Sequence, residues 1–260
     1  MTTRQAQIQV QSPARTLRQK MASAGLVRIM ATHSPLSARL AEEAGFDGLW
    51  ASGFELSALC GLADVSLISM TQHLDMVRAI AEQSRLPLVA DLDTGFGNAI
   101  NVIHAVEQYQ RAGAAAVVIE DKTFPKVTSL AVDGRQELVR IAEFQGKIEA
   151  DMILVHSKQK TPDEIESFVK AWTGTLPIAI VPTAYPQLNE ARIRALGKIA
   201  MVIYGNHAIR AAVTAMQDVF ARIIADGGIH AVDKDIVPVE EIFRLQRMDQ
   251  ITAAERKFLR

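Results

Sequence analysis

The chain has 260 residues, of which 49% are hydrophobic, and a formal net charge of −1. This composition predicts a folded protein with a sizeable core and argues against wholesale disorder. Nucleic-acid and membrane-surface binding would require a basic excess that the chain lacks, so we expect neither kind of partner.

The sequence favours a cytoplasmic protein. Cys60 is the only cysteine, so no intramolecular disulfide can form and the chain fits a reducing compartment. Residues 1–20 are polar and lack the apolar run of a signal peptide. No apolar stretch approaches the roughly 20 residues that a membrane span needs.

Short apolar runs alternate with amphipathic stretches from about residue 12 to about residue 226. The apolar runs predict buried strands at 26–32, 49–52, 88–91, 114–120, 152–155, 177–181 and 199–204. The stretches around them predict helices at 12–25, 34–45, 69–84, 99–112, 135–148, 161–172 and 207–225. Residues 161–164, Thr-Pro-Asp-Glu, are typical of a capping box at a helix start.

This alternation indicates a parallel sheet covered by helices on both faces. About seven strands are predicted, one fewer than a (β/α)8 TIM-type barrel requires. The alternative is an open doubly wound sheet, but no Gly-x-Gly-x-x-Gly follows the first strand, which argues against it.

The junction near residue 150 is where a βα unit is expected to be missing. Most helix-to-strand turns of this chain contain Gly or Pro, for example Gly25, Gly45 and Pro87, which cap the helix or stop it. The predicted helix 135–148 instead meets the next strand through residues 149–151, which contain neither.

The pattern changes after residue 232. Pro238 opens an amphipathic helix over 239–248, and a short helical tail follows. We expect residues 1–232 to form a catalytic barrel and residues 233–260 to form a helical extension that packs on a partner subunit. This arrangement predicts a homo-oligomer, either a dimer or a tetramer.

The sharpest chemical signal is segment 91–98, Asp-Leu-Asp-Thr-Gly-Phe-Gly-Asn, which directly follows an apolar strand. Residues i and i+2 of a strand point to the same side, so Asp91 and Asp93 can converge on one hard cation. Mg²⁺ prefers oxygen ligands and retains waters, so one or two carboxylates suffice. The alternative is a pair of solvated carboxylates in a glycine turn.

Further polar residues follow other predicted strands. Glu120 and His156 each end a strand, Asn206 follows the last strand, and Asp64 lies in the loop after the second. Taken singly, each has a structural explanation as a strand-end charge, a structural histidine, a helix cap or a loop carboxylate. Taken together, they lie at the carboxyl ends of several strands, where barrel enzymes place their sites.

Seven blocks of sequence resemble the phosphoenolpyruvate mutase/isocitrate lyase superfamily, and within it the phosphonopyruvate hydrolase group. Segment 91–98 is similar to the metal-binding signature of the superfamily. The remaining blocks occur in the order found in that group, at 50–54, 120–126, 156–158, 181–183, 206–207 and 241–246. The resemblance covers the chain from about residue 12 onward.

The resemblance implies a metal centre for Mg²⁺, with Mn²⁺ or Co²⁺ as alternatives. It implies that Asp91 binds the metal directly and that Asp93, Glu120 and Asp64 hold it largely through water. The substrate-binding residues that it implies are Trp50, Ser52, Gly53 and Phe54 at the carboxylate end, Asn206 and His156 near the phosphonate, and Lys126 on a gating loop.

Three branches of the superfamily can be weighed. The lyases carry a Lys-Lys-Cys-Gly-His loop, whereas this chain has no cysteine there. The mutases resemble Lys-Thr-Asn-Ser-Leu on the gating loop, and residues 126–130 of this chain read Lys-Val-Thr-Ser-Leu. Thr128 in place of Asn resembles the hydrolase pattern. Our hypothesis is that the shorter hydroxyl admits or positions water that a mutase has to exclude.

The chain departs from the family at the junction already noted. Members of the family carry a strand with Ala-Arg-Val-Glu-Ala, then a helix, before the strand that ends in His156, and this chain lacks both. The resemblance implies that the arginine of that strand binds the phosphonate. Its loss would remove a bidentate partner for a dianion.

The implied reaction is the hydrolysis of phosphonopyruvate to pyruvate and phosphate. We expect Thr128 and His156 to orient the attacking water and Asp64 to act as base or as nucleophile. The alternatives are a phosphoenolpyruvate mutase, another lyase or decarboxylase of 2-oxo acids, and an inactive, internally deleted homologue.

Overall fold

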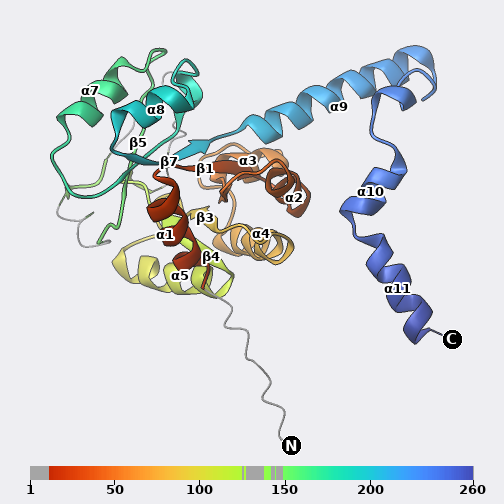
Figure 1. The fold of residues 1–260 in the computed structure, drawn as a ribbon, viewed down its shortest axis with the longest axis horizontal. Coiled ribbons are helices and arrows are strands. Elements are labelled where there is room, and N and C mark those ends of the chain that lie inside the picture. Colours follow the sequence, from red (N-terminus) through yellow and green to blue (C-terminus); the bar gives the residue numbers. More distant parts are fainter. Residues whose placement is uncertain (1–11, 125, 127–137, 142–143, 145–148, 260) are drawn as a thin grey trace, which may run out of the picture. The chain divides into compact units, whose positions relative to one another are not determined.

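A computed structural model describes residues 12–124, 126, 138–141, 144 and 149–259 of the chain (Figure 1). Thr128 and nine of the fourteen residues of the helix predicted at 135–148 lie outside these residues.

All seven predicted strands are confirmed, and they form one sheet in the order β4-β3-β2-β1-β7-β6-β5. Every neighbouring pair is parallel. The strands are β1 Val27–Thr32, β2 Gly48–Ala51, β3 Leu88–Asp91, β4 Ala114–Val118, β5 Ile153–Val155, β6 Ile178–Ile180 and β7 Ile199–Tyr204.

The strand order is that of a barrel with one position left open. Neighbours in the sheet are neighbours in the sequence except where the last strand, β7, returns to pair with the first, β1. A doubly wound sheet would instead reverse its order at a switch point. The two ends of the sheet are β4 and β5, so the open position lies at the junction where the sequence predicts a missing βα unit.

Helices lie between most consecutive strands along the chain, and one helix, Pro13–Ala24, precedes the first strand (Figure 1). Two short ones, α3 and α8, were not predicted from the sequence. The helices are α1 Pro13–Ala24, α2 Pro35–Glu43, α3 Gly53–Leu59, α4 Met70–Gln83, α5 Ala99–Arg111, α7 Asp163–Ala171, α8 Glu190–Leu196, α9 His207–Asp226, α10 Val239–Leu245 and α11 Met248–Phe258, with 3₁₀ turns η1 Pro182–Ala184 and η2 Asp233–Asp235.

The capping box predicted at residues 161–164 is wrong. Helix α7 begins only at Asp163, and the Thr161 hydroxyl donates to the Asp163 carboxylate at 2.8 Å instead of capping a backbone N–H. The Glu164 carboxylate accepts a hydrogen bond from the Ser157 hydroxyl, so it is not available to reach back to the cap.

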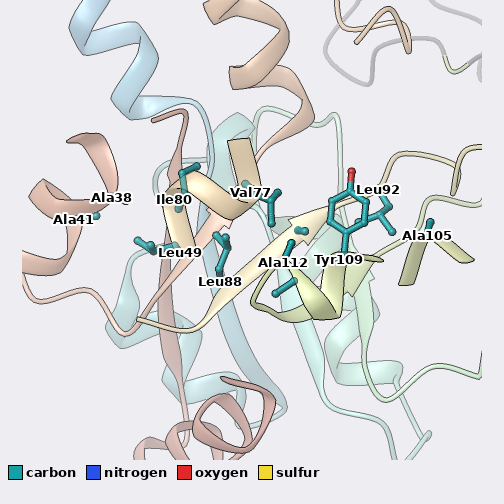
Figure 2. Close-up of a cluster of buried hydrophobic side chains, with 13 residues drawn as sticks. Ala38, Ala41, Leu49, Val77, Ile80, Leu88, Leu92, Ala105, Tyr109 and Ala112 are labelled. Carbon is teal, nitrogen blue, oxygen red and sulfur yellow. The ribbon is translucent and has the colours of Figure 1, made fainter. Parts of the chain in front are cut away.

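Strand alternation sorts the apolar side chains into an inner and an outer core. Alternate residues such as Ile29, Trp50 and Ile203 pack with Leu17 of α1 in a cluster on the inner face of the curled sheet. Strand residues of opposite parity pack against α2, α4 and α5 on one side of the barrel, as Figure 2 shows for Leu49 and Leu88 in the same cluster as Tyr109 of α5. On the other side they pack against α7 and α8.

The chain divides into two compact units, Met1–Ala208 and Ile209–Arg260. The first contains the whole sheet. In the second, Arg222 of α9 donates to the carbonyl of Ala231 and to the carboxylate of Asp235, each at 2.6 Å. Among the described residues, none of the helices combines the length and apolar character needed to cross a bilayer.

A buried histidine makes the stability of the barrel depend on pH. His73 of α4 is 4% exposed, and its Nδ1 lies 2.8 Å from the hydroxyl of Tyr109 on α5. Burial, together with the charge of Lys126, lowers the pKa of His73 to about 4. Unfolding restores an ordinary pKa near 6.5, so the unfolded chain binds the extra proton between these values.

This histidine therefore contributes stability above about pH 6.5 that is lost as the pH falls toward 4. We expect the free energy of unfolding of the parent chain, measured with urea, to fall by about 2 kcal/mol between pH 7 and pH 5 relative to that of His73→Gln. His104→Gln, at an exposed site on α5, is the control, and its free energy of unfolding should depend on pH as that of the parent chain does. An identical pH dependence in the parent chain and in His73→Gln would contradict the prediction.

Candidate metal and substrate site

The predicted site residues gather at the carboxyl ends of the strands. Asp91 is the last residue of β3, and Glu120 lies two residues beyond β4. His156 follows β5, and Asn206 lies two residues beyond β7. In parallel barrels these ends share one face, so the topology brings side chains from distant parts of the sequence into one region.

Asp93 reaches the site by a different route from the one predicted. Strand β3 ends at Asp91, and Asp93 lies in the following turn with a φ of 51°, so strand alternation does not place it. Its backbone N–H donates to Asp91 Oδ1 at 3.1 Å, and its carbonyl accepts from the N–H of Glu120 at 2.6 Å. The turn thus folds against the end of β4 and holds three carboxylates near one another.

A buried lysine lies among these carboxylates. Lys126 Nζ is 2.8 Å from Asp64 Oδ1 and 2.5 Å from Asp93 Oδ1, and its side chain is only 3% exposed. A second ammonium, that of Lys122, pairs with Glu120 Oε2 at 2.8 Å. Asp64 enters this cluster from the loop after α3. The sequence predicts it in the loop after the second strand, without this short helix between them.

The backbone at Gly53 forms one wall of the cluster. Its N–H donates to Asp91 Oδ2 at 3.3 Å. A Cβ added at Gly53 would lie 2.9 Å from Asp93 Oδ1 and 3.5 Å from Asp91 Oδ2. Ser52 caps the N-terminus of α3, where its hydroxyl accepts from the N–H of Glu55 at 3.2 Å. Glycine is therefore required here because the backbone has to approach the carboxylates closely.

Burial and mutual repulsion disfavour charge on the carboxylates. Burial raises the pKa of Asp91 to about 6, although the Lys126 ammonium opposes the rise. Burial raises the pKa of Asp93 and of Glu120 as well. Burial would lower the pKa of Lys126, but Asp91, Asp93 and Asp64 outweigh it and raise that pKa. The cluster therefore favours a bound cation.

The donor set fits a divalent cation that keeps part of its water shell. The four carboxylates of Asp64, Asp91, Asp93 and Glu120 outnumber the two ammoniums of Lys122 and Lys126, so the cluster keeps an excess of negative charge that favours a divalent ion. No three His, Cys, Asp or Glu side chains among the described residues are arranged to ligate one ion together. Mg²⁺ needs only one or two carboxylates in addition to water.

His156 and Asn206 come from the strands on the other side of the open position. Burial lowers the pKa of His156, and the charges of Lys122, Glu120 and Lys158 also act on it. Its Nδ1 is buried and finds no hydrogen-bond partner among the described residues. Asn206 is buried with a φ of 57°. A neutral imidazole close to two lysines is suited to contact an anion or a water molecule.

The remaining predicted substrate residues flank this region. Trp50 is buried in the inner apolar cluster, and Phe54 is half-buried in the first turn of α3. Sequence reasoning missed Ser66, whose hydroxyl donates to Asp93 Oδ2 at 3.5 Å and accepts from the Lys126 N–H at 3.4 Å. Its position two residues after Asp64 could have drawn attention, but its φ of 60° has no signature in the sequence.

A sequence model of the phosphoenolpyruvate phosphomutase family matches residues 17–150 and 149–224. The two matched segments meet at the junction where the sheet is open. The chain is 51% identical to a phosphonopyruvate hydrolase of Variovorax sp. (strain Pal2), over 94% of this chain and 98% of that protein. It is 36% identical to a phosphoenolpyruvate phosphomutase of Tetrahymena pyriformis, over 94% of each chain.

The alignment with the hydrolase also measures the gap. It spans 284 positions, whereas 94% of the 260 residues is about 244 residues, so about 40 positions have no counterpart in this chain. A βα unit is of that size.

Solved structures agree with the sequence comparison. The structure resembles that of a phosphonopyruvate hydrolase in complex with oxalate and Mg²⁺, with a TM-score of 0.90, 48% identity and coverage of 96% of this chain and 100% of that chain. It resembles a phosphoenolpyruvate phosphomutase from Streptomyces platensis subsp. rosaceus with a TM-score of 0.92, 38% identity and coverage of 95% and 99%. The chain belongs to the phosphoenolpyruvate mutase family.

Proposed function

We propose that this chain hydrolyses the carbon–phosphorus bond of phosphonopyruvate to give pyruvate and phosphate, with Mg²⁺ as cofactor. The observation that carries the proposal is 51% identity to a phosphonopyruvate hydrolase across 98% of that protein. A hydrolase whose structure is similar was solved with oxalate and Mg²⁺. The phosphomutase reaction is the second candidate, since phosphomutase relatives are 34% to 36% identical to this chain.

The carboxylate cluster would hold the cofactor. Asp91 would bind Mg²⁺ directly, and Asp64, Asp93 and Glu120 would hold it largely through water. When bound, Mg²⁺ supplies positive charge that stabilises the negative charge developing on the pyruvate enolate. The structure supports this assignment through the excess negative charge of the cluster and through the Gly53 N–H, which donates to Asp91 Oδ2.

The other residues of the site would bind the substrate and position water. Ser52, Gly53 and Phe54 are next to Asp91 and would hold the carboxylate and carbonyl end of the substrate. His156 and Asn206 would line the phosphonate end. Phosphoryl transfer passes through a loose transition state, so the main task of these residues is positioning. Thr128 and His156 would orient the water, and Asp64 would act as base or nucleophile.

The missing unit weakens the phosphonate half of this site. The arginine that relatives carry on the absent strand has no counterpart here, so a bidentate contact to the dianion is lost. Lys122 and Lys158 act electrostatically on His156 and leave some positive charge near it. We therefore propose a hydrolase whose turnover is impaired by the deletion.

Phosphorus NMR of the chain with phosphonopyruvate and Mg²⁺ tests the proposal. We expect inorganic phosphate to accumulate slowly. Insertion of the roughly 40 missing positions of the Variovorax hydrolase between residues 149 and 150 should speed its release by about tenfold or more, because a bidentate charged contact is restored.

Three outcomes are informative. Conversion to phosphoenolpyruvate by either chain would favour the phosphomutase. Release of phosphate by the repaired chain alone would identify the present chain as an inactive homologue. No reaction of phosphonopyruvate with either chain would contradict the proposed substrate.

Substitution of Gly53 tests the wall of the metal site. The Cβ of Gly53→Ala would lie 2.9 Å from Asp93 Oδ1, so the carboxylate has to move. We expect Mn²⁺ and oxalate to bind about tenfold more weakly, as measured by titration calorimetry, because overpacking costs about 1–3 kcal/mol. Gly228→Ala is the control, since its Cβ would meet nothing within 4 Å. Equal affinities in both variants would contradict the assignment.

We also propose that the protein is a cytoplasmic homo-oligomer, with residues 1–232 as the catalytic barrel and residues 233–260 as an extension that packs on a partner subunit. Helix α10 supports this proposal because Val239, Ile242 and Phe243, spaced three and four apart, are exposed apolar side chains on one face. A second copy of the chain would bury them.

Light scattering coupled to gel filtration should give a multiple of the 28.4 kDa chain mass. Phe243→Glu should shift the protein toward monomer, because a buried charge opposes association. Glu240→Gln, on the same helix, is the matched control. A monomeric mass for the parent chain would contradict the proposal.

A further inference from the structure

Lys126 lies in the space where the proposed metal would be held. Its Nζ contacts Asp64 Oδ1 at 2.8 Å and Asp93 Oδ1 at 2.5 Å. The position of a Cβ on Gly53 is 3.6 Å from the same Nζ, close to Asp91 as well. One ammonium therefore occupies the region between the Gly53 backbone and the carboxylates that would hold the divalent ion.

We propose that Lys126 is a built-in competitor for the divalent cation, which neutralises the carboxylates in the metal-free chain and has to leave them when the metal binds. The inference rests on the metal site of the proposed function and adds a residue that sets its affinity. An ammonium and a divalent cation that share the same carboxylate oxygens repel each other strongly in a buried site.

The metal-free chain needs this lysine. Asp91, Asp93 and Glu120 are largely buried, and unpaired buried carboxylates would be strongly destabilising. Lys126 supplies the opposite charge from inside the chain, so the barrel can fold before it meets a metal ion. The same interaction has to be broken when the ion enters, so the free energy of metal binding is less favourable by the free energy of that interaction.

The attachment of Lys126 permits such a movement. Its backbone N–H donates to Ser66 Oγ, and the same hydroxyl donates to Asp93 Oδ2. The backbone is thus tied to the site while the flexible four-carbon stem carries the charge. A change of rotamer can withdraw Nζ from the carboxylates without moving the backbone.

Equilibrium binding of Mn²⁺ to the full chain, without substrate and followed by electron paramagnetic resonance, tests the competition. We expect Lys126→Met to bind Mn²⁺ about tenfold more tightly than the parent chain, because no ammonium has to be displaced. Without metal, this variant should unfold at a lower temperature, and saturating Mn²⁺ should remove the difference. Lys170→Met is the control, since Lys170 lies on the surface of α7 and pairs with Glu166.

Equal or weaker binding by Lys126→Met would overturn the role of Lys126 and leave the metal centre standing. Absence of Mn²⁺ binding in both chains would overturn the metal centre of the proposed function together with this inference. If the variant does not fold, amine-reactive labelling of the parent chain tests the role of Lys126 instead. Mass spectrometry should then find Lys126 labelled faster with Mn²⁺ than without it, and an unchanged rate would overturn the proposal.

Discussion

The concentration of negative charge at one end of the barrel is the constraint on which the rest of the site depends. Asp91, Asp93 and Glu120 are held close together by backbone hydrogen bonds between the turn after β3 and the end of β4. That geometry is tolerable only while cations are present, since burial raises the pKa of each carboxyl. Lys126 supplies positive charge from within the chain, and a divalent ion would supply more.

Much of the fold could be predicted because apolar periodicity and helix punctuation are local. The seven strands and the missing unit follow from buried runs and from a helix-to-strand junction, residues 149–151, without Gly or Pro. The pairing of β7 with β1, which joins the first and last strands in one sheet, is a long-range contact that no local pattern reveals. Helices α3 and α8 were missed because each has only seven residues, too few for a clear period.

The site was predicted less fully for a related reason. Strand ends and a motif locate Asp91 and Glu120, but the convergence of Asp93 depends on a left-handed turn rather than on strand alternation. The ion pair of Lys126 with Asp64 joins residues 62 positions apart in the sequence, and Ser66 completes the same network. Such contacts arise from tertiary packing, so residue type and spacing alone do not reveal them.

The open position borders both parts of the proposed site. The carboxylates and Gly53 come from β2, β3 and β4 and the loops that follow them, and β4, which precedes Glu120, is one end of the sheet. His156 comes from β5, which has β6 on one side and the open position on the other. The missing unit therefore adjoins the strand that precedes Glu120 as well as the strand that precedes His156. Asp91 and Gly53 come from β3 and from the end of β2, and each of these strands has a neighbour on both sides. In the proposed function, binding of a metal and an enolate mimic would depend mainly on this inner pair of strands, whereas cleavage of the carbon–phosphorus bond would also require His156.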